Sequence, residues 1–232
     1  MGALYWSVAS LPSSEDMEAL QSRLACAFPA EGNQEYLKAL AGERTPPRIA
    51  AARLGALALL PDLMAYAGIS SSAVVLRRDP QGRPYGDLLS DNGVAFDFNL
   101  SHSNSYALCA LLTGGGRVGV DIEDTIPIHR ALPLMRRYCT EGEMGRMEAL
   151  SEEEQALAFT RIWTIREALG KQEGIGMPLR YDASVIPREI RVVSGQIGGS
   201  RACLTLCYPR DALAEAPTQV FCDASVSWER DV

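Results

Sequence analysis

Residues 117–125, RVGVDIEDT, alternate between apolar and other side chains, and this pattern restricts the fold more than any other in the chain. A period of two predicts a β-strand buried on one face, because successive side chains point to opposite faces. Asp121 and Glu123 then share the other face, roughly 7 Å apart. Carboxylates at this distance repel each other unless a cation or a basic side chain lies between them. Two interpretations remain open: a hard divalent ion such as Mg²⁺ held by both acids, or an exposed strand edge protected by charge.

The rest of the chain combines helical and strand-like patterns, which predicts an α+β fold. Helical periodicity or strong apolar character covers residues 13–40, 49–69, 130–138 and 151–173. Alternation or β-branched composition predicts strands near residues 4–8, 72–79, 94–103, 105–112, 117–123 and in four segments between 182 and 228. The segment 80–87 is expected to be a turn because it is rich in Pro and Gly.

The sequence TGGG at 113–116 lies at the centre of the chain. It favours a hairpin turn between the flanking strands, and the alternative is a joint between two halves of similar length. We expect the halves to be residues 1–113, which would supply nucleotide contacts, and 114–232, which would supply the acids and the long helix. No internal repeat is strong enough to prove a duplication.

Composition excludes several classes of protein. The 232 residues are 47% hydrophobic and 22% charged, as in a soluble globular protein, and the net charge of −7 argues against general nucleic-acid binding. The apolar run 49–69 is about as long as a membrane span, but Arg53, Pro61 and Asp62 interrupt it, so we expect a buried helix. The N-terminus lacks a signal-peptide pattern, and the six cysteines show no CxxC spacing. We expect a reduced protein in the cytoplasm that does not bind membranes.

The helix expected at 151–173 adds a third acid. Ser151 followed by three glutamates is a capping box, and an apolar stripe at steps of four and three residues should face the core. Glu167 lies on another face with Trp163 and Lys171, four residues before and after it. A solvated Glu–Lys pair explains this spacing. However, Trp163 would be unusual on a fully wet face, so we expect a second surface to cover it.

The segment FNLSHS, residues 98–103, contains His102, one of only two histidines in the chain. A histidine between serines at the end of a strand can donate to a phosphate, transfer a proton or simply satisfy a local turn. A serine hydrolase is disfavoured, because the G-x-S-x-G nucleophile motif is absent.

Three of these blocks together resemble the surfactin-type 4′-phosphopantetheinyl transferases. They are FNLSHS (98–103), GVDIE (119–123) and WTIREALGKQEGIG (163–176), in the order and at the separations typical of that family. The resemblance is weaker over residues 44–86. Two positions depart from the family pattern: Arg166 replaces the first lysine of W-x-x-K-E-A-x-x-K, and Arg83 replaces the lysine of a G-K-P turn.

The resemblance implies a fold of two similar α/β halves, whose antiparallel sheets pack around a central cleft with pseudo-twofold symmetry. It implies an enzyme that transfers 4′-phosphopantetheine from coenzyme A to a serine hydroxyl of an acyl or peptidyl carrier protein. The resemblance further implies that the reaction requires Mg²⁺, which Mn²⁺ can replace in that family, and that it releases 3′,5′-ADP. The alternatives are a homologue that binds coenzyme A or a carrier without turnover, and a Mg²⁺-dependent pyrophosphate hydrolase. We expect a monomer.

The resemblance also assigns roles to residues. Asp121, Glu123 and Glu167 would bind the metal. Asp121, Glu167 and Lys171 would be catalytic, with either Glu167 or a metal-bound water as the base. The expected contacts to coenzyme A are Lys171, Ser101, His102 and Arg83, with looser matches at Arg53, Arg44 and Arg48. The carrier is expected to dock near residues 105–150, where Arg117, Arg130, Arg136 and Arg137 lie.

Overall fold

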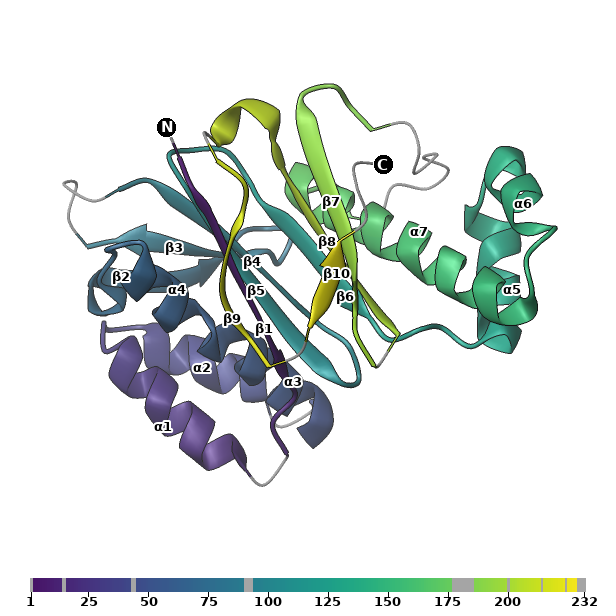
Figure 1. Ribbon diagram of the computed structural model, residues 1–232. Helices are drawn as coiled ribbons and strands as arrows, with labels where there is room; N and C mark the ends of the chain where they lie inside the picture. The colour runs from purple at the N-terminus through teal and green to yellow at the C-terminus, as the bar shows by residue number, and fades with distance from the viewer. Residues whose placement is uncertain are drawn as a thin grey trace.

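The computed structural model describes residues 2–13, 16–42, 45–89, 94–176, 186–199, 201–213, 215–223 and 225–228. Within these residues the protein is built from two four-stranded sheets, one two-stranded hairpin and seven α-helices (Figure 1). The mixed α+β fold predicted from the sequence is confirmed. The helices are α1 (Met17–Ala27), α2 (Asn33–Ala41), α3 (Pro47–Ala58), α4 (Leu60–Tyr66), α5 (Ile128–Tyr138), α6 (Glu141–Met147) and α7 (Glu152–Glu173).

The first sheet has the strand order β4-β5-β1-β9. Its strands are β1 (Leu4–Ser10), β4 (Phe96–His102), β5 (Tyr106–Thr113) and β9 (Thr218–Cys222). Neighbouring strands are antiparallel except for β9, which runs parallel to β1. One face of this sheet packs against α1–α4, and the hairpin of β2 (Val74–Arg78) and β3 (Pro84–Leu88) lies beside the same helices (Figure 1).

The second sheet has the order β10-β7-β8-β6 and is antiparallel throughout. Its strands are β6 (Gly119–Glu123), β7 (Ile190–Ile197), β8 (Ala202–Pro209) and β10 (Val226–Trp228). One face of this sheet packs against α7, through Ile165 and Leu169. The other face packs against the first sheet, so that a shared apolar core lies between the two sheets.

The core explains the alternation of the strands. Leu4, Trp6 and Val8 of β1 are buried between the sheets, as their period of two predicts. The stretch Pro47–Tyr66, which contains α3 and α4, is long and apolar enough to cross a membrane, but 67% of an 18-residue window within it is buried inside the protein. Leu54, Leu57 and Leu60 pack in the core beside the first sheet. This stretch is therefore a core element, as its interrupted pattern predicts.

The glycine-rich centre of the chain is not a hairpin turn. Residues 114–116 all have positive φ angles, and they carry the chain from β5 in the first sheet to β6 in the second. The favoured prediction was therefore wrong, because the strands on either side of this segment belong to different sheets. The division of the chain into two halves at this point stays a prediction. A turn pattern in sequence cannot tell whether the flanking strands pair with each other or with strands elsewhere.

Three other expectations need correction. The helix expected over 13–40 is two helices, because Pro29 and the left-handed Gly32 (φ 92°) interrupt it. The turn expected at 80–87 is shorter, since β3 begins at Pro84, and α6 was not anticipated. The strand-like segment 218–228 divides into β9 and β10, which join different sheets. Residues 182–185, where another strand was expected, lie outside the described residues.

Candidate active site

Strand β6 presents one face to the core and the other to α7. Val118, Val120 and Ile122 are buried between the sheets. Gly119 begins the opposite face, where a side-chain Cβ would lie 2.0 Å from the carbonyl oxygen of Ala168 on α7. Only glycine permits this close approach, and the approach brings the face that carries Asp121 and Glu123 against the helix.

Side chains of β4 hold β6 in place. The backbone N–H groups of β6 and the residue before it donate to alternate side chains of β4: Val118 to Asp97 (2.7 Å), Val120 to Asn99 (2.9 Å) and Ile122 to Ser101 (3.4 Å). These bonds join β4 and β6, which are edge strands of two different sheets. The two strands are not paired with each other through their backbones. The ladder therefore fixes where the acids of β6 lie relative to the first sheet.

Helix α7 supplies the third wall of the site. Its N-terminus has the predicted capping box, in which Ser151 and Glu154 satisfy each other's backbone N–H groups. Trp163 is partly buried and packs edge-on against Tyr138 at a centroid distance of 5.6 Å, so α5 covers it as expected. With its apolar stripe fixed on the second sheet, α7 turns Glu167 and Lys171 toward β6.

A cavity of about 290 Å³ lies where these elements meet. The residues that line it come from β4, β6 and α7, and they include six predicted site residues: Ser101, His102, Asp121, Glu123, Glu167 and Lys171. Residues separated by up to 70 positions in the sequence therefore converge on one open space. Trp163 also lines it and forms an apolar side of the cavity.

Lys171 is bound to β6 rather than to Glu167. Its Nζ donates to Asp121 Oδ1 (2.7 Å), to the carbonyl oxygen of Val120 (3.0 Å) and to Ser101 Oγ (3.1 Å). Ser101 Oγ also donates to Asp121 Oδ1 at 2.7 Å. The solvated Glu167–Lys171 pair considered from the sequence is not the arrangement observed.

The acids of the cavity lie close enough to affect one another. Burial raises the pKa of Glu123 to about 7, and repulsion from Asp121 and Asp124 adds to this rise. Burial, followed by the charge of Asp121, also raises the pKa of Glu167 above its ordinary value. Burial lowers the pKa of His102, and the nearby positive charges of Lys171 and Arg53 lower it further.

The residues fit a hard divalent cation by the chemistry of their donors. Three carboxylates line one cavity, and carboxylate oxygens are preferred ligands of Mg²⁺. Among the described residues, no group of three or more His, Cys, Asp or Glu side chains is already arranged as a metal site. Asp121 instead neutralises part of its charge through Lys171. A cation bound here would have to share or replace this contact.

Arg83 contacts the protein through both of its terminal nitrogens. One donates to the carbonyl oxygen of Lys171 (2.6 Å), and the other to Asp97 (2.5 Å) and to the carbonyl oxygen of Val118 (2.8 Å). Burial lowers the pKa of Arg83 despite the Asp97 carboxylate beside it. Arg83 thus ties the β2–β3 turn to β4, the start of β6 and the end of α7. It also lines a second cavity of about 250 Å³, which shares Leu100 and Lys171 with the first.

Among the described residues, the other arginines predicted to bind phosphate do not line the main cavity. Arg53 is exposed on α3, near enough to His102 to affect its pKa. Arg48 is also exposed, and its Nη2 donates to the carbonyl oxygen of Asn104 at 3.1 Å, just beyond the FNLSHS segment. Arg44 lies outside the described residues.

The arginines expected in carrier docking are divided between two places. Arg130 lines a groove of about 470 Å³ beside α5, which also contains Glu123 and Trp163 and so adjoins the main cavity. Arg136 and Arg137 are exposed in the last turn of α5. Arg117 instead lies against Gly174, near the cavity that Arg83 lines.

Arg166, which stands where the related family has lysine, is buried. It donates to Glu143 Oε2 at 2.6 Å and to the carbonyl oxygen of Tyr138, with its side chain 1% exposed. It therefore fastens α5 and α6 to α7. From the sequence, Arg166 was recognised only as a replacement for the family's lysine, and its buried position was not predicted.

The polar ladder of β4 was also missed. A signal for it was present, because Asp97, Asn99 and Ser101 alternate strictly with Phe96, Phe98 and Leu100. Polar residues on one face of a strand ordinarily indicate a solvated surface, and only the position of β6 reveals their partners.

Comparison with known protein families supports the same class of protein. Residues 117–208 match the model of the 4′-phosphopantetheinyl transferase superfamily. The matched region runs from the start of β6 to β8 and contains α7, so Asp121, Glu123, Glu167 and Lys171 all lie within it. This region of the chain is therefore similar to that superfamily.

Several curated relatives carry the same description. The chain is 35% identical over 86 residues to the 4′-phosphopantetheinyl transferase Sfp of Bacillus subtilis, covering 37% of each chain. It is 32% identical over 113 residues to HetI of Nostoc, covering 48% of this chain and 46% of the relative. It is 43% identical over 82 residues to AcpT of Salmonella typhimurium, covering 35% and 42%. The alignments span less than half the length of these relatives.

Proposed function

We propose that the protein transfers the 4′-phosphopantetheine group of coenzyme A to a serine hydroxyl of an acyl or peptidyl carrier protein. The observation that carries this proposal is the meeting of Ser101, His102, Asp121, Glu123, Glu167 and Lys171 around one cavity. Four of these residues, Asp121, Glu123, Glu167 and Lys171, lie inside the region that matches the transferase superfamily. We propose further that the enzyme is of the surfactin type, because both sheets of one chain contribute to the site.

In the proposed reaction the serine oxygen attacks the β-phosphorus of coenzyme A. A new P–O bond forms, the bond to the bridging oxygen of the pyrophosphate breaks, and 3′,5′-ADP leaves. We assign Glu167 as the base that takes the serine proton, since it lines the cavity beside the other reacting groups. Lys171 would hold phosphate oxygens, because its ammonium group already lies in the cavity wall.

The three acids Asp121, Glu123 and Glu167 would hold a Mg²⁺ ion. When bound, this ion would reduce the repulsion between the nucleophile and the phosphates and stabilise charge on the leaving group. Ser101 would help to position Asp121, to which its hydroxyl already donates.

The cavity lined by Arg83 adjoins the main one and is our candidate for the nucleotide part of coenzyme A. His102, which lines the main cavity, and Arg53 and Arg48 would bind further phosphate oxygens. Arginine suits this role, because its planar guanidinium group can donate two parallel hydrogen bonds.

We propose that the carrier docks on the groove beside α5, because this groove adjoins the cavity through Glu123 and Trp163. Arg130, Arg136 and Arg137 would then meet the acidic surface typical of carrier domains. A monomer suffices for this function, since one chain supplies every wall of the cavity. We place the protein in the cytoplasm, where its six cysteines would remain reduced.

The direct test is a transfer assay. Purified protein, coenzyme A and Mg²⁺ are incubated with a panel of apo carrier proteins, and each carrier is weighed by mass spectrometry. We expect a gain of one phosphopantetheine group on at least one carrier, and no gain when the metal is removed by chelation.

The same assay separates the alternatives. Coenzyme A that binds in calorimetry without any transfer would indicate a binding protein and contradict the proposal. Cleavage of coenzyme A in the absence of a carrier would indicate a pyrophosphate hydrolase.

A further inference from the structure

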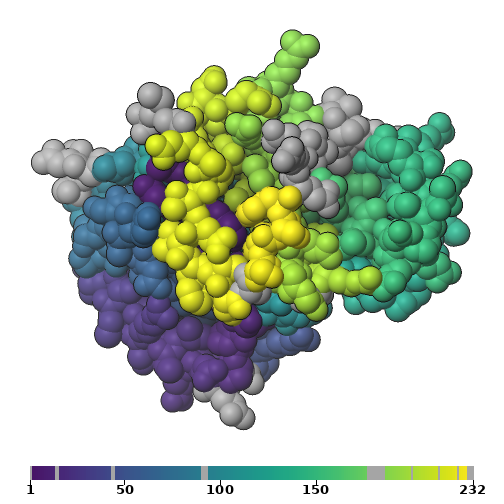
Figure 2. Space-filling model, in the orientation of Figure 1, coloured from purple at the N-terminus to yellow at the C-terminus, as the bar shows by residue number. Residues whose placement is uncertain are grey.

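A separate cavity of about 450 Å³ lies on the other face of the second sheet. Side chains of β8 alternate, so Leu206 and Tyr208 face the first sheet while Cys207 faces α7. The cavity opens above Leu206 and Tyr208, and its 12 lining residues differ from those that line the cavities beside Asp121. Figure 2 shows a hollow between the yellow surfaces of the C-terminal strands, with the purple N-terminal strand visible inside it.

Two tryptophans, Trp6 and Trp228, form one end of this cavity. Trp6 is buried on β1, and Trp228 on β10 meets it edge-on, with ring centroids 5.2 Å apart and planes at 87°. Trp228 reaches this position because its neighbour across the strands is Gly195, where a Cβ would lie 2.8 Å from the indole ring. Backbone packing on one side and a buried ring on the other therefore fix the wall.

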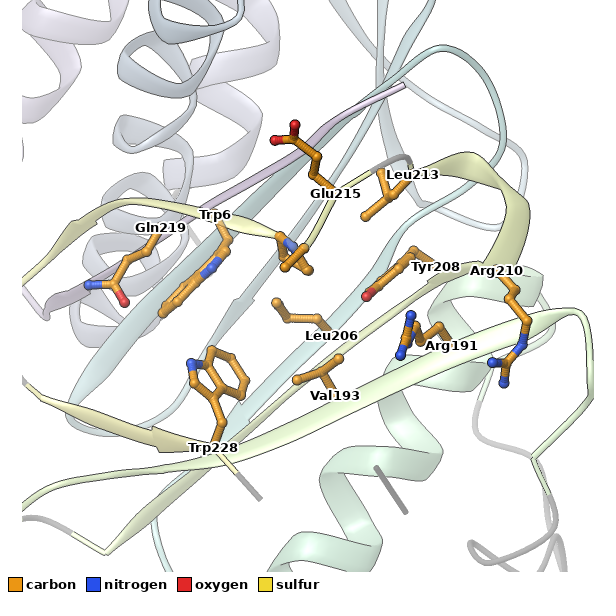
Figure 3. A pocket seen from close by; sticks show the side chains of 12 residues that line it. Trp6, Arg191, Val193, Leu206, Tyr208, Arg210, Leu213, Glu215, Gln219 and Trp228 are labelled. Carbon is orange, nitrogen blue, oxygen red and sulfur yellow. The ribbon is translucent and has the colours of Figure 1, made fainter. Parts of the chain in front are cut away.

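The other end of the cavity carries positive charge. Arg191 and Arg210 line it together with Tyr208, and Figure 3 shows Leu206 and Val193 between this end and the two tryptophans. Arg210 is anchored by the carbonyl oxygens of Arg188 (2.8 Å from Nε) and Ile190 (3.4 Å from Nη2). Glu215 lies on the opposite wall, with its carboxylate turned away from both guanidinium groups (Figure 3).

We propose that this cavity is a second binding site, which takes a small aromatic carboxylate. The apolar and aromatic walls provide area and ring contacts for a flat body, and such ring contacts add to the effect of buried area. The two guanidinium groups at the opposite end suit a carboxylate, which accepts paired hydrogen bonds from arginine. The ligand would lie with its ring beside Trp228 and its anionic group beside Arg191 and Arg210. The volume of the cavity lies in the range of ordinary small-molecule sites.

The proposal is tested with two probes of the same shape, indole-3-acetate and the neutral indole-3-acetamide, in a ligand-observed NMR titration of the 232-residue chain. We expect the acid to bind with a Kd of about 1 mM or tighter. The amide should bind about tenfold more weakly, because it lacks the charge-assisted hydrogen bonds.

Variants locate the binding. Arg191→Gln together with Arg210→Gln should weaken the acid about tenfold and leave the amide unchanged, and Trp228→Ala should weaken both. Arg23→Gln is the matched control, since Arg23 is an exposed arginine on α1 and should have no effect. Circular dichroism verifies that each variant is folded.

Three results would contradict the proposed binding site. Equal affinity for acid and amide, full affinity in the double arginine variant, or no binding of the acid at about 10 mM would each overturn the proposal. Because the site shares no lining residue with the cavity around Asp121, neither result depends on whether the protein is a transferase.

Discussion

Helix α7 carries two cation–carboxylate pairs, five residues apart, and their surroundings differ sharply. Arg166 meets Glu143 at 2.6 Å with side chains 1% and 0% exposed. Lys171 meets Asp121 at 2.7 Å with side chains 28% and 9% exposed, at the edge of an open cavity. A buried pair is costly to break because the remaining charge has no water, whereas a pair at a cavity can exchange its partner for a ligand. Pairs with similar distances therefore serve differently: Arg166–Glu143 fastens buried helices, whereas Lys171–Asp121 lies at the open cavity proposed as the active site.

The largest effect on activity is expected at the Lys171–Asp121 pair beside the cavity. Asp121→Ala should reduce phosphopantetheine transfer at least about 10³-fold, equal to roughly 4 kcal/mol, because it removes the acid that both the lysine and the proposed metal require. The fold should survive, since Lys171 remains partly in water. Transfer rates by mass spectrometry and melting by circular dichroism measure the two effects. Asp87→Ala, which removes a carboxylate of an exposed ion pair on β3, is the control. A loss of less than tenfold would contradict the assignment.

The buried pair should show the reverse behaviour. Arg166→Met should lower the free energy of unfolding by about 3 kcal/mol, because it leaves Glu143 charged and buried. Urea denaturation followed by tryptophan fluorescence measures this change. Arg77→Met, at an exposed pair, should cost less than about 1 kcal/mol. If Arg166→Met were as stable as this control, the structural role of the pair would be refuted.

Gly119 tests whether the Lys171–Asp121 pair depends on the close packing of β6 against α7. Gly119→Ala places a Cβ 2.0 Å from a backbone oxygen of α7, so the helix must move. We expect a loss of about 2 kcal/mol in stability, together with reduced transfer. Gly145→Ala in α6 is the matched control, because nothing lies within 4 Å of its Cβ, and it should be neutral or slightly stabilising. Equal stability of the two variants would show that α7 does not rest on Gly119.

Removing one hydrogen bond of the ladder between β4 and β6 should have a smaller effect on stability. Asn99→Ala leaves the buried N–H of Val120 without its acceptor and should cost about 1 to 2 kcal/mol in unfolding free energy. Asn104→Ala, an exposed residue beyond the same strand, serves as the control. Unchanged stability in Asn99→Ala would mean that another group replaces the lost acceptor.

The smallest effect is expected at the rim of the site. Arg53→Gln should raise the KM for coenzyme A about threefold and leave kcat nearly unchanged, because an exposed arginine contributes to binding only weakly. Arg23→Gln, at an exposed ion pair of α1, should change neither constant. A fall in kcat without a change in KM would place Arg53 in the chemistry rather than in binding.

Much of the site could be predicted from local pattern. The period of two in β6 directed Asp121 and Glu123 to one face, and the helical period of α7 separated Glu167 and Lys171 from its apolar stripe. These predictions succeeded because a strand or helix fixes which side chains share a face, whatever surrounds it. The partners of Lys171 and Arg83 could not be predicted in this way, because they lie on strands far away in the sequence.

The sequence by itself indicated most of the elements, their buried faces and six residues that line the candidate site. Only the tertiary structure decided that TGGG joins two sheets, that residues 218–228 divide between them, and that Arg166 fastens α7 while Lys171 reaches Asp121. The physical reason is that periodicity records burial along one element, whereas hydrogen bonds and ion pairs depend on which distant element arrives at that surface. The aromatic cavity of Trp6 and Trp228 has the same origin, since its two walls come from opposite ends of the chain.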